Sequence, residues 1–357
     1  MKKSPAQIQF LQRRKVSQKE LAVYSRELSV MIDAELPLIQ SLEIISGQTK
    51  NKYFKKAIEQ ISEELKAGSQ LHQAKRKFPR IFNTLYCNLI LSGEQSGDLN
   101  VMLNRIADYL ENNIKLLSTV RQAMVYPIVI LGVAVLVIIF MMWKVVPIFS
   151  SIFMEFEADL PFLTSAILSA SQFVQGNIIF IFFGILALFF FFRFFKKTAG
   201  GRKTLDMLSL KIPVFGGVLK KVGLSRVTRT MNTLIVGGVP LLESLDITSS
   251  TAGNVVLEKK ILEARSLISV GSSLTDAFNQ VGGFPVLFLR LISLGEATGT
   301  LESALKRLTS YYEDAVEASV STLLSFLEPL LLVLVGGIVG TIVISLYLPM
   351  FNLMQQI

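Results

Sequence analysis

The stretches GEQSGDL at residues 93–99 and GEATGTL at residues 295–301 decide the fold, because the second repeats the first 202 positions later. Flanking residues recur with almost the same shift, and a single one-residue slip over so long a match is not a chance pattern. The chain therefore contains a duplication, in which each copy is a helical domain followed by an apolar span. The matched pairs include Arg26 and Arg229, Pro37 and Pro240, Gly68 and Gly271, Tyr109 and Tyr311, Glu111 and Glu313, Pro127 and Pro329, and Pro147 and Pro349.

The composition places much of the chain in lipid. Of its 357 residues 51% are apolar and only 18% are charged, which is too apolar for an ordinary soluble enzyme. Residues 124–146 carry one charge, Lys144, near their end, and residues 176–192 and 329–354 carry none. A helix needs about 20 apolar residues to cross a bilayer. The sequence predicts three transmembrane helices.

The basic residues predict the orientation of these spans. Residues 1–121 carry 19 Lys and Arg, and a basic run follows the second span, whereas residues 148–175 carry three acids and no base. Basic loops stay in the cytoplasm, so we expect both repeat domains to be cytoplasmic and the C-terminus to lie outside. Residues 1–20 hold six bases and no apolar run, which indicates a basic tail and not a signal peptide.

The net charge of +9 follows largely from this topology and from attraction to anionic headgroups. We find no face on which basic and aromatic residues alternate, so we expect no nucleic-acid partner. Lys144 lies near the end of the first span, and its side chain is expected to extend to the outer membrane interface.

Both copies show helical periodicity and no convincing strand pattern. Leu21, Tyr24 and Leu28 share one face of a first helix, and Pro37 and Pro240 each begin the next helix. In the second copy residues 237–238 are Gly-Gly, which suits the end of the first helix, whereas the first copy has Ala-Glu at residues 34–35, so its turn must differ or be strained. We expect an all-α fold with two compact helical domains of about 100 residues.

The repeated motif supplies the main candidate site residues. Gly93 and Gly295 lie late in an apolar helix, and Gly97 and Gly299 are expected to end it with a positive φ. Glu94 and Glu296 occupy the same place in each copy. Each carboxylate can cap a neighbouring helix, pair with Arg26 or Arg229, contact a partner or bind a metal, and the sequence leaves these alternatives open.

In the third span Gly336 and Gly340 form a GxxxG pattern. Small residues let two membrane helices approach closely. The pattern also arises by chance in a glycine-rich span, so both a helix–helix contact and a chance occurrence remain open.

The sequence offers no catalytic, cofactor or metal site. It has no GxxxxGK[ST] phosphate loop, and one histidine with one cysteine cannot make an ordinary zinc site. His72 lies in a polar stretch and is expected at the surface, while Cys87 lies in an apolar run and is expected to be a buried structural thiol. We therefore expect a protein that is not an enzyme and binds no cofactor.

These residues resemble a known family. Two helical domains with an LPL motif (VPL in the second copy) and a GExxG motif, each followed by a span that begins YP or EP, are similar to the type II secretion system F / type IV pilus assembly PilC family over residues 17–357. The chain departs from the family pattern at Glu35, where glycine is usual, and at Asn83, where the second copy has Pro285. The N-terminal extension is also short.

The resemblance implies a non-enzymatic inner-membrane platform protein whose cytoplasmic domains are six-helix bundles. Its implied partners are a cytoplasmic hexameric ATPase, pilin or pseudopilin subunits, other inner-membrane assembly proteins, further copies of itself and the lipid bilayer. The platform would couple the ATPase to insertion of filament subunits. Whether the filament serves secretion, motility, adhesion or DNA uptake stays open, as do the oligomeric state and the repeat that contacts the ATPase.

Two alternatives remain, a small multi-pass membrane transporter and a membrane scaffold unrelated to filaments. A transporter needs ionisable residues or broken helices in its spans, and here only residues 336–340 hint at a break. The predicted segments are a basic tail (1–20), repeat domain 1 (21–121), span 1 (122–147), an extracytoplasmic connection (148–175), span 2 (176–195), a basic connector (196–222), repeat domain 2 (223–326), span 3 (327–350) and an extracytoplasmic tail (351–357).

Overall fold

A computed structural model describes residues 16–155, 161–196, 198–212 and 215–354. Regular structure in these residues is helical throughout, without a strand, which confirms the all-α expectation. Two compact units emerge from the contacts. One joins the described residues up to Ser118 with Gly216–Val316, and the other joins residues 119–215 with the end of α16. Most of the N-terminal tail and residues 156–160 of the acidic connection lie outside the described residues, as do residues 355–357 of the C-terminal tail.

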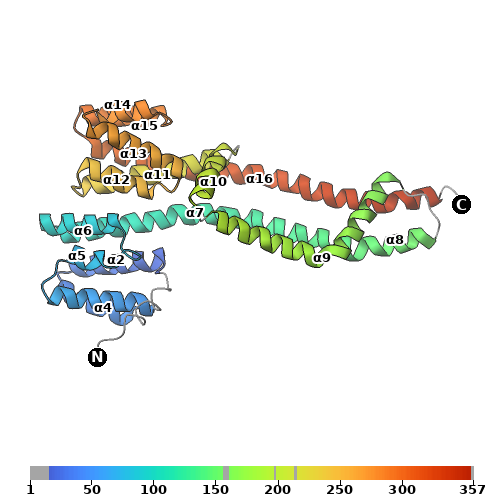
Figure 1. The fold of residues 1–357 in the computed structure, drawn as a ribbon, viewed down its shortest axis with the longest axis horizontal. Coiled ribbons are helices and arrows are strands. Elements are labelled where there is room, and N and C mark those ends of the chain that lie inside the picture. Colours follow the sequence, from blue (N-terminus) through green and yellow to red (C-terminus); the bar gives the residue numbers. More distant parts are fainter. Residues whose placement is uncertain (1–15, 156–160, 197, 213–214, 355–357) are drawn as a thin grey trace. The chain divides into compact units, whose positions relative to one another are not determined.

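Each repeat is built from six helices, as the resemblance implies (Figure 1). The first copy comprises α2 (Gln18–Asp33), α3 (Leu38–Gln48), α4 (Lys52–Lys66), α5 (Leu71–Arg76), α6 (Thr84–Ser96) and the start of α7 (Leu99–Phe140). The second comprises α11 (Phe215–Val236), α12 (Leu241–Thr251), α13 (Val255–Ser269), α14 (Leu274–Val281), α15 (Val286–Ala297) and the start of α16 (Leu301–Met354).

The turn between the first two helices differs between the copies. In the second copy Gly238 takes a φ of 76°, a left-handed conformation that glycine adopts freely. In the first copy Glu35 holds the same place with a φ of 61° and is the one non-glycine residue at positive φ among those described. The backbone therefore keeps one geometry in both copies, and the first copy bears the strain of a side chain there.

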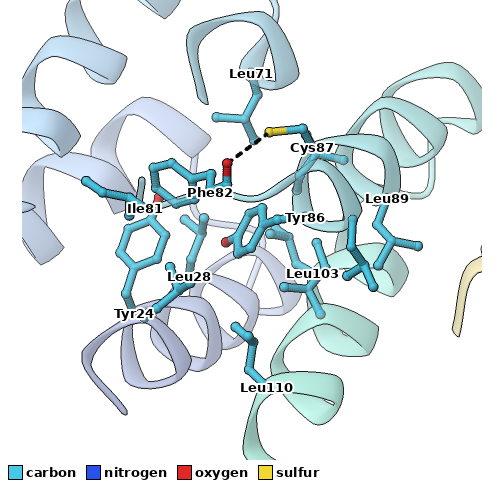
Figure 2. Close-up of a cluster of buried hydrophobic side chains, with 14 of the residues drawn as sticks. Tyr24, Leu28, Leu71, Ile81, Phe82, Tyr86, Cys87, Leu89, Leu103 and Leu110 are labelled. Atoms are coloured by element: carbon cyan, nitrogen blue, oxygen red, sulfur yellow. Dashed lines mark hydrogen bonds between the residues drawn. The ribbon is translucent and has the colours of Figure 1, made fainter. Parts of the chain in front are cut away.

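Aromatic side chains fill the core of the first repeat. Tyr24 lies edge-on to Phe54 with ring centroids 5.1 Å apart, and Phe82 lies edge-on to Tyr86 at 5.0 Å. Figure 2 shows Tyr24, Phe82 and Tyr86 grouped with aliphatic side chains from neighbouring helices. Cys87 is buried in this core, as expected, and burial raises the pKa of its thiol.

The second repeat has a separate core, in which Phe278 lies within 5.2 Å of both Phe284 and Phe288, measured between ring centroids. These three phenylalanines come from α14, α15 and the turn that joins them. Each repeat thus buries its own apolar face, as a domain must.

The second unit contains the apolar helices. Two continuous helical stretches, Leu99–Phe153 and Leu301–Pro349, are long and apolar enough to cross a membrane. The pair Phe162–Ile181 and Leu186–Phe195 within α9 (Phe162–Phe195) passes the same test if it forms one span, with a bend of 51°. The chain is therefore a membrane protein, and the prediction of three spans stays a prediction.

Helix contacts in this unit combine apolar packing with buried hydroxyls. Leu168 of α9 and Ile342 of α16 belong to one buried cluster with residues of α8 (Val146–Glu155). Thr164 donates a hydrogen bond of 2.6 Å to the Ser345 carbonyl, and Ser171 donates one of 2.5 Å to the Met142 carbonyl in a short π-helix, η1 (Met141–Val145). Such hydroxyl–carbonyl bonds hold helices together where no water competes.

Candidate functional site

The Glu94 carboxylate caps the start of the short helix α5. Its two oxygens accept hydrogen bonds from the backbone N–H groups of Leu71 and His72, at 2.5 and 3.3 Å. The Oε2 atom also lies 2.5 Å from the Nδ1 of His72. The first N–H groups of a helix have no partner within the helix, so a carboxylate from α6 satisfies them and ties the two helices together.

Glu296 does the same in the second copy. It accepts from the N–H groups of Leu274 and Thr275 at 2.6 and 2.9 Å, and from the Thr275 hydroxyl at 2.6 Å. Burial alone would raise the pKa of this carboxyl, but the hydrogen bonds from Thr275 and Leu274 outweigh it and lower the pKa. Of the alternatives that the sequence left open, the capping geometry is thus present in both copies.

The glycines of the motif have two different tasks. Gly97 and Gly299 take φ values of 80° and 68° where the helix ends. Gly93 and Gly295 lie within helices, where the next helix approaches closely. A Cβ at Gly295 would lie 2.7 Å from the Cβ of Ala304, and one at Gly93 would lie 2.9 Å from the Cγ of Met102. The whole GExxG motif therefore works inside each repeat, as a close contact, a cap and a turn.

The two arginines do not pair with the motif carboxylates. Arg26 binds Glu111 through two hydrogen bonds of 2.8 and 2.7 Å, and it contacts Asp108 at 2.5 Å. These bonds from Arg26 lower the pKa of Glu111. Arg229 pairs with Glu313, the residue matched to Glu111, through its Nη2 atom alone. Each ion pair joins the first helix of a repeat to its last helix. Both partners recur at matched positions of the duplication, and this recurrence is the sequence signal that could have predicted the pairs.

The remaining sequence candidates lie apart from the motif. Pro37 and Pro240 occupy the position just before α3 and α12, with φ values of −57° and −54°. A Cβ at Gly336 or Gly340 would meet nothing within 4 Å in the described chain. The contact expected at the GxxxG pattern is thus not made within this part of the chain, and its use between chains stays a prediction.

The expectation that His72 lies at the surface is wrong. The residue is buried, because its helix packs against α6 and Glu94 draws the imidazole inward. The polar residues next to His72 gave no sign of its contact with Glu94, because this acid lies 22 residues further along the chain.

Lys75 is a further buried residue that no sequence pattern predicted, and its side chain is 0% exposed. Its ammonium lies 4.6 to 5.2 Å from the ring centroids of Tyr86, Phe82 and Tyr24, and it donates a hydrogen bond of 3.3 Å to the Tyr86 hydroxyl. Burial lowers the pKa of this lysine to about 7. The second copy has Phe278 at the matched position, so the duplication itself pointed to an unusual residue.

The two repeats contact each other directly within their unit. Asn88 of α6 donates a hydrogen bond to Glu243 of α12, and the Ser92 hydroxyl donates to the carbonyl of Gly237. The hydroxyls of Tyr109 and Thr230 lie 3.3 Å apart. Residues of α11 and α12 also join the apolar core of the first repeat, so the two copies form one body.

A polar cavity of about 310 Å³ lies between the repeats. Arg105, Arg229 and Lys306 line it together with Asp108 and Glu313. The Nε and Nη1 atoms of Arg229 are buried there without a hydrogen-bond partner. Among the described residues no group of three or more His, Cys, Asp or Glu could hold a metal ion.

Comparison with known proteins agrees with this architecture. The family model for protein F of the type II secretion system (T2SS) matches residues 24–147 and again residues 227–349. The type IV pilus assembly protein PilC of Myxococcus xanthus is 38% identical over 338 residues, which cover 95% of this chain and 81% of the relative. PilC of Pseudomonas aeruginosa is 35% identical over 95% of this chain and 91% of its own length. The type II secretion system protein F of Vibrio cholerae is 29% identical over 97% and 86%.

Proposed function

The chain belongs to the type II secretion system protein F family, and from this membership we propose that it is the inner-membrane platform of a filament-assembly machine. In this role it couples a cytoplasmic ATPase to the insertion of pilin or pseudopilin subunits. The observation that carries the proposal is the double family match, which covers both copies of the repeat and the apolar stretches that follow them. The similar relatives are named as pilus assembly or secretion proteins.

The proposed partners are a separate ATPase and further copies of the chain. It has no phosphate loop of its own, so any energy for assembly comes from a separate ATPase. The two repeats belong to one compact unit, and their sequences are related but not identical. We propose that both face the cytoplasm, where they offer quasi-equivalent docking surfaces, and that the protein acts as a homo-oligomer without enzymatic activity.

The proposed topology has three spans and places the C-terminus outside. It is supported by the basic residues around the repeats and by the acidic connection at residues 148–175. The bent helix α9 supplies the middle span, which has no counterpart in the repeat. Without this span the second repeat would lie on the opposite side of the membrane from the first.

A deletion strain tests the proposal. Removing the gene should abolish surface filaments or pseudopilus-dependent secretion, and the full-length chain should restore them. The detergent-solubilised chain should co-purify with a P-loop ATPase and a pilin. An ATPase variant without its phosphate-loop lysine serves as the control, because it should bind the chain but assemble no filaments. Normal filament numbers without the chain, or with the ATPase deleted, would overturn the proposal.

A further inference from the structure

One face of α6 in the first repeat is covered by the second repeat. Leu85 and Leu89 of this face are 2% and 0% exposed. Asn88 and Ser92 of the same face bond to Glu243 and to the Gly237 carbonyl. The cover is the turn between α11 and α12, whose Val239 joins the core of the first repeat. We call this covered side the α6 face and its cover the α11–α12 turn.

The matched face of α15 has no such cover among the residues that the structure describes. Its residues lie 202 positions further on, where Leu287, Leu291 and Leu294 correspond to Leu85, Leu89 and Ser92. Leu287 is 38% exposed and Leu294 is 59% exposed. The neighbouring Val286 is also exposed and stands where the first copy has Thr84. The second copy thus exposes Leu294 and Val286 where the first copy has Ser92 and Thr84. The α15 face also carries Arg290 in place of Asn88. Exposed apolar side chains beside polar ones are typical of an interaction site.

The complementary turn is also uncovered, at the other repeat. The α11–α12 turn buries Leu234, Gly237 and Val239. At the matched positions of the α2–α3 turn, Met31 and Leu36 are only partly buried and Ala34 is exposed. Each chain therefore makes this contact once, internally, and presents one unused half of it at each repeat.

We propose that the α15 face of one chain docks on the α2–α3 turn of a second copy of this chain. The contact is head-to-tail, because it joins two different surfaces. Interfaces of this kind close into rings or continue as open rows. The proposal deepens the homo-oligomer part of the proposed function and rests on it. The partner is a second copy of this chain, because the internal interface already joins the same two kinds of surface, a helix face and a turn between helices.

The fit can be followed residue by residue. Arg290 takes the place of Asn88 and faces the position of Gln40, which corresponds to Glu243. Leu294 takes the place of Ser92 and lies over Ala34, so an apolar contact replaces a hydrogen bond. Ala34 carries a Cβ where Gly237 has none, and a Cβ at Gly237 would lie 2.6 Å from Leu89. At this point the backbones of the two chains are therefore expected to lie further apart than those of α6 and the α11–α12 turn do in the internal contact.

Crosslinking between two differently tagged full-length chains tests the contact. Both chains carry Cys87→Ala, one carries Arg290→Cys and the other Gln40→Cys. A short bismaleimide applied to membranes should join the two tags. The pair Asn88→Cys with Glu243→Cys in one chain is the positive control, because these side chains are hydrogen-bonded. Arg290→Cys with Lys56→Cys on the exposed side of α4 is the negative control.

A second variant asks whether the apolar face drives the contact. Leu294→Asp should reduce the crosslinked product about tenfold or more, because it places a carboxylate in an apolar contact. Val270→Asp is the matched control, since Val270 is also apolar and exposed but lies outside the α15 face. Its product should stay unchanged.

Three results would overturn the inference: no product between Arg290→Cys and Gln40→Cys, an equal product between two Arg290→Cys chains, or a product that Leu294→Asp leaves intact. Filament counts in the same strains keep the two proposals apart. A missing crosslink with chain-dependent filaments overturns only this contact, whereas filaments without the chain overturn the platform function.

Discussion

Lys75 makes the stability of the first repeat depend on pH. The lysine is fully buried among three aromatic rings, and burial lowers its pKa from 10.5 to about 7. The unfolded chain therefore binds a proton at Lys75 more tightly than the folded chain does. Whenever the unfolded state binds more protons, the free energy of unfolding rises with pH. Lys75 thus weakens the repeat most at and below pH 7, and this loss fades as the pH rises toward 10.5.

The size of the effect follows from the two pKa values. Between pH 6.5 and 8.5 the unfolded lysine stays protonated, whereas the folded lysine loses its proton. The free energy of unfolding of the first repeat should therefore rise by about 2 kcal/mol over this interval, which lowers the open population roughly 25-fold. Lys75→Met keeps the length of the side chain but removes the titrating group, so the variant should lack this increase and be more stable at pH 6.5.

Cys87 provides the assay, because it is the one cysteine of the chain and lies in the same core. Its labelling by a maleimide requires the repeat to open, so the labelling rate of the full chain in detergent reports the open population. Rates are divided by those of the urea-unfolded chain at the same pH, which removes the intrinsic reactivity of the thiol. Lys56→Met, on the exposed side of α4, is the matched control and should behave like the parent.

The comparison of slopes isolates the contribution of the buried Lys75, because each variant differs from the parent at one lysine only. The proposed effect of Lys75 is refuted if Lys75→Met and the parent show the same change in protection between pH 6.5 and 8.5. It is also refuted if Lys75→Met opens more readily than the parent at pH 6.5.

Three further changes test the motif and the strained turn. Gly295→Ala should destabilise the second repeat by about 1–3 kcal/mol, because its new Cβ meets the rigid Ala304. Gly93→Ala should destabilise the first repeat less, because its new Cβ meets a flexible methionine. Limited proteolysis of both variants compares the two losses of stability, and equal losses would contradict this account. Glu94→Gln should cost about 1–2 kcal/mol by weakening the cap of α5, read from Cys87 labelling, where unchanged protection would count against a capping role. Glu35→Gly should gain about 0.5–1 kcal/mol by relieving a left-handed residue, and faster Cys87 labelling would disprove the strain.

The duplication made much of the fold predictable. The helical periodicity indicated two all-α domains, and the matched Gly97 and Gly299 indicated where α6 and α15 end. The absence of glycine at Glu35 pointed to an unusual turn. These features are local, so residue spacing and backbone preference are enough to reveal them.

The unpredicted features all depend on contacts between distant segments. His72 is buried because of Glu94, and the inter-repeat bond joins Asn88 to a carboxylate 155 residues away. The tight approach at Gly93 depends on how α7 packs, which no local pattern encodes. Comparing the copies position by position would have flagged Lys75, since a lysine aligned with a core phenylalanine must either be exposed or be unusual.

The internal use of GExxG bears on how such chains can be compared and redesigned. Since each motif is satisfied within its own domain, exchanging residues 70–104 with residues 273–306 should keep the cap, turn and close contact of each motif while it exchanges the α6 and α15 faces. Such chimeras would separate inheritance of the scaffold from choice of partner. The GExxG motif therefore marks the shared scaffold. Differences between filament-assembly machines should be sought in the other residues of α6 and α15, on the outer sides of these helices.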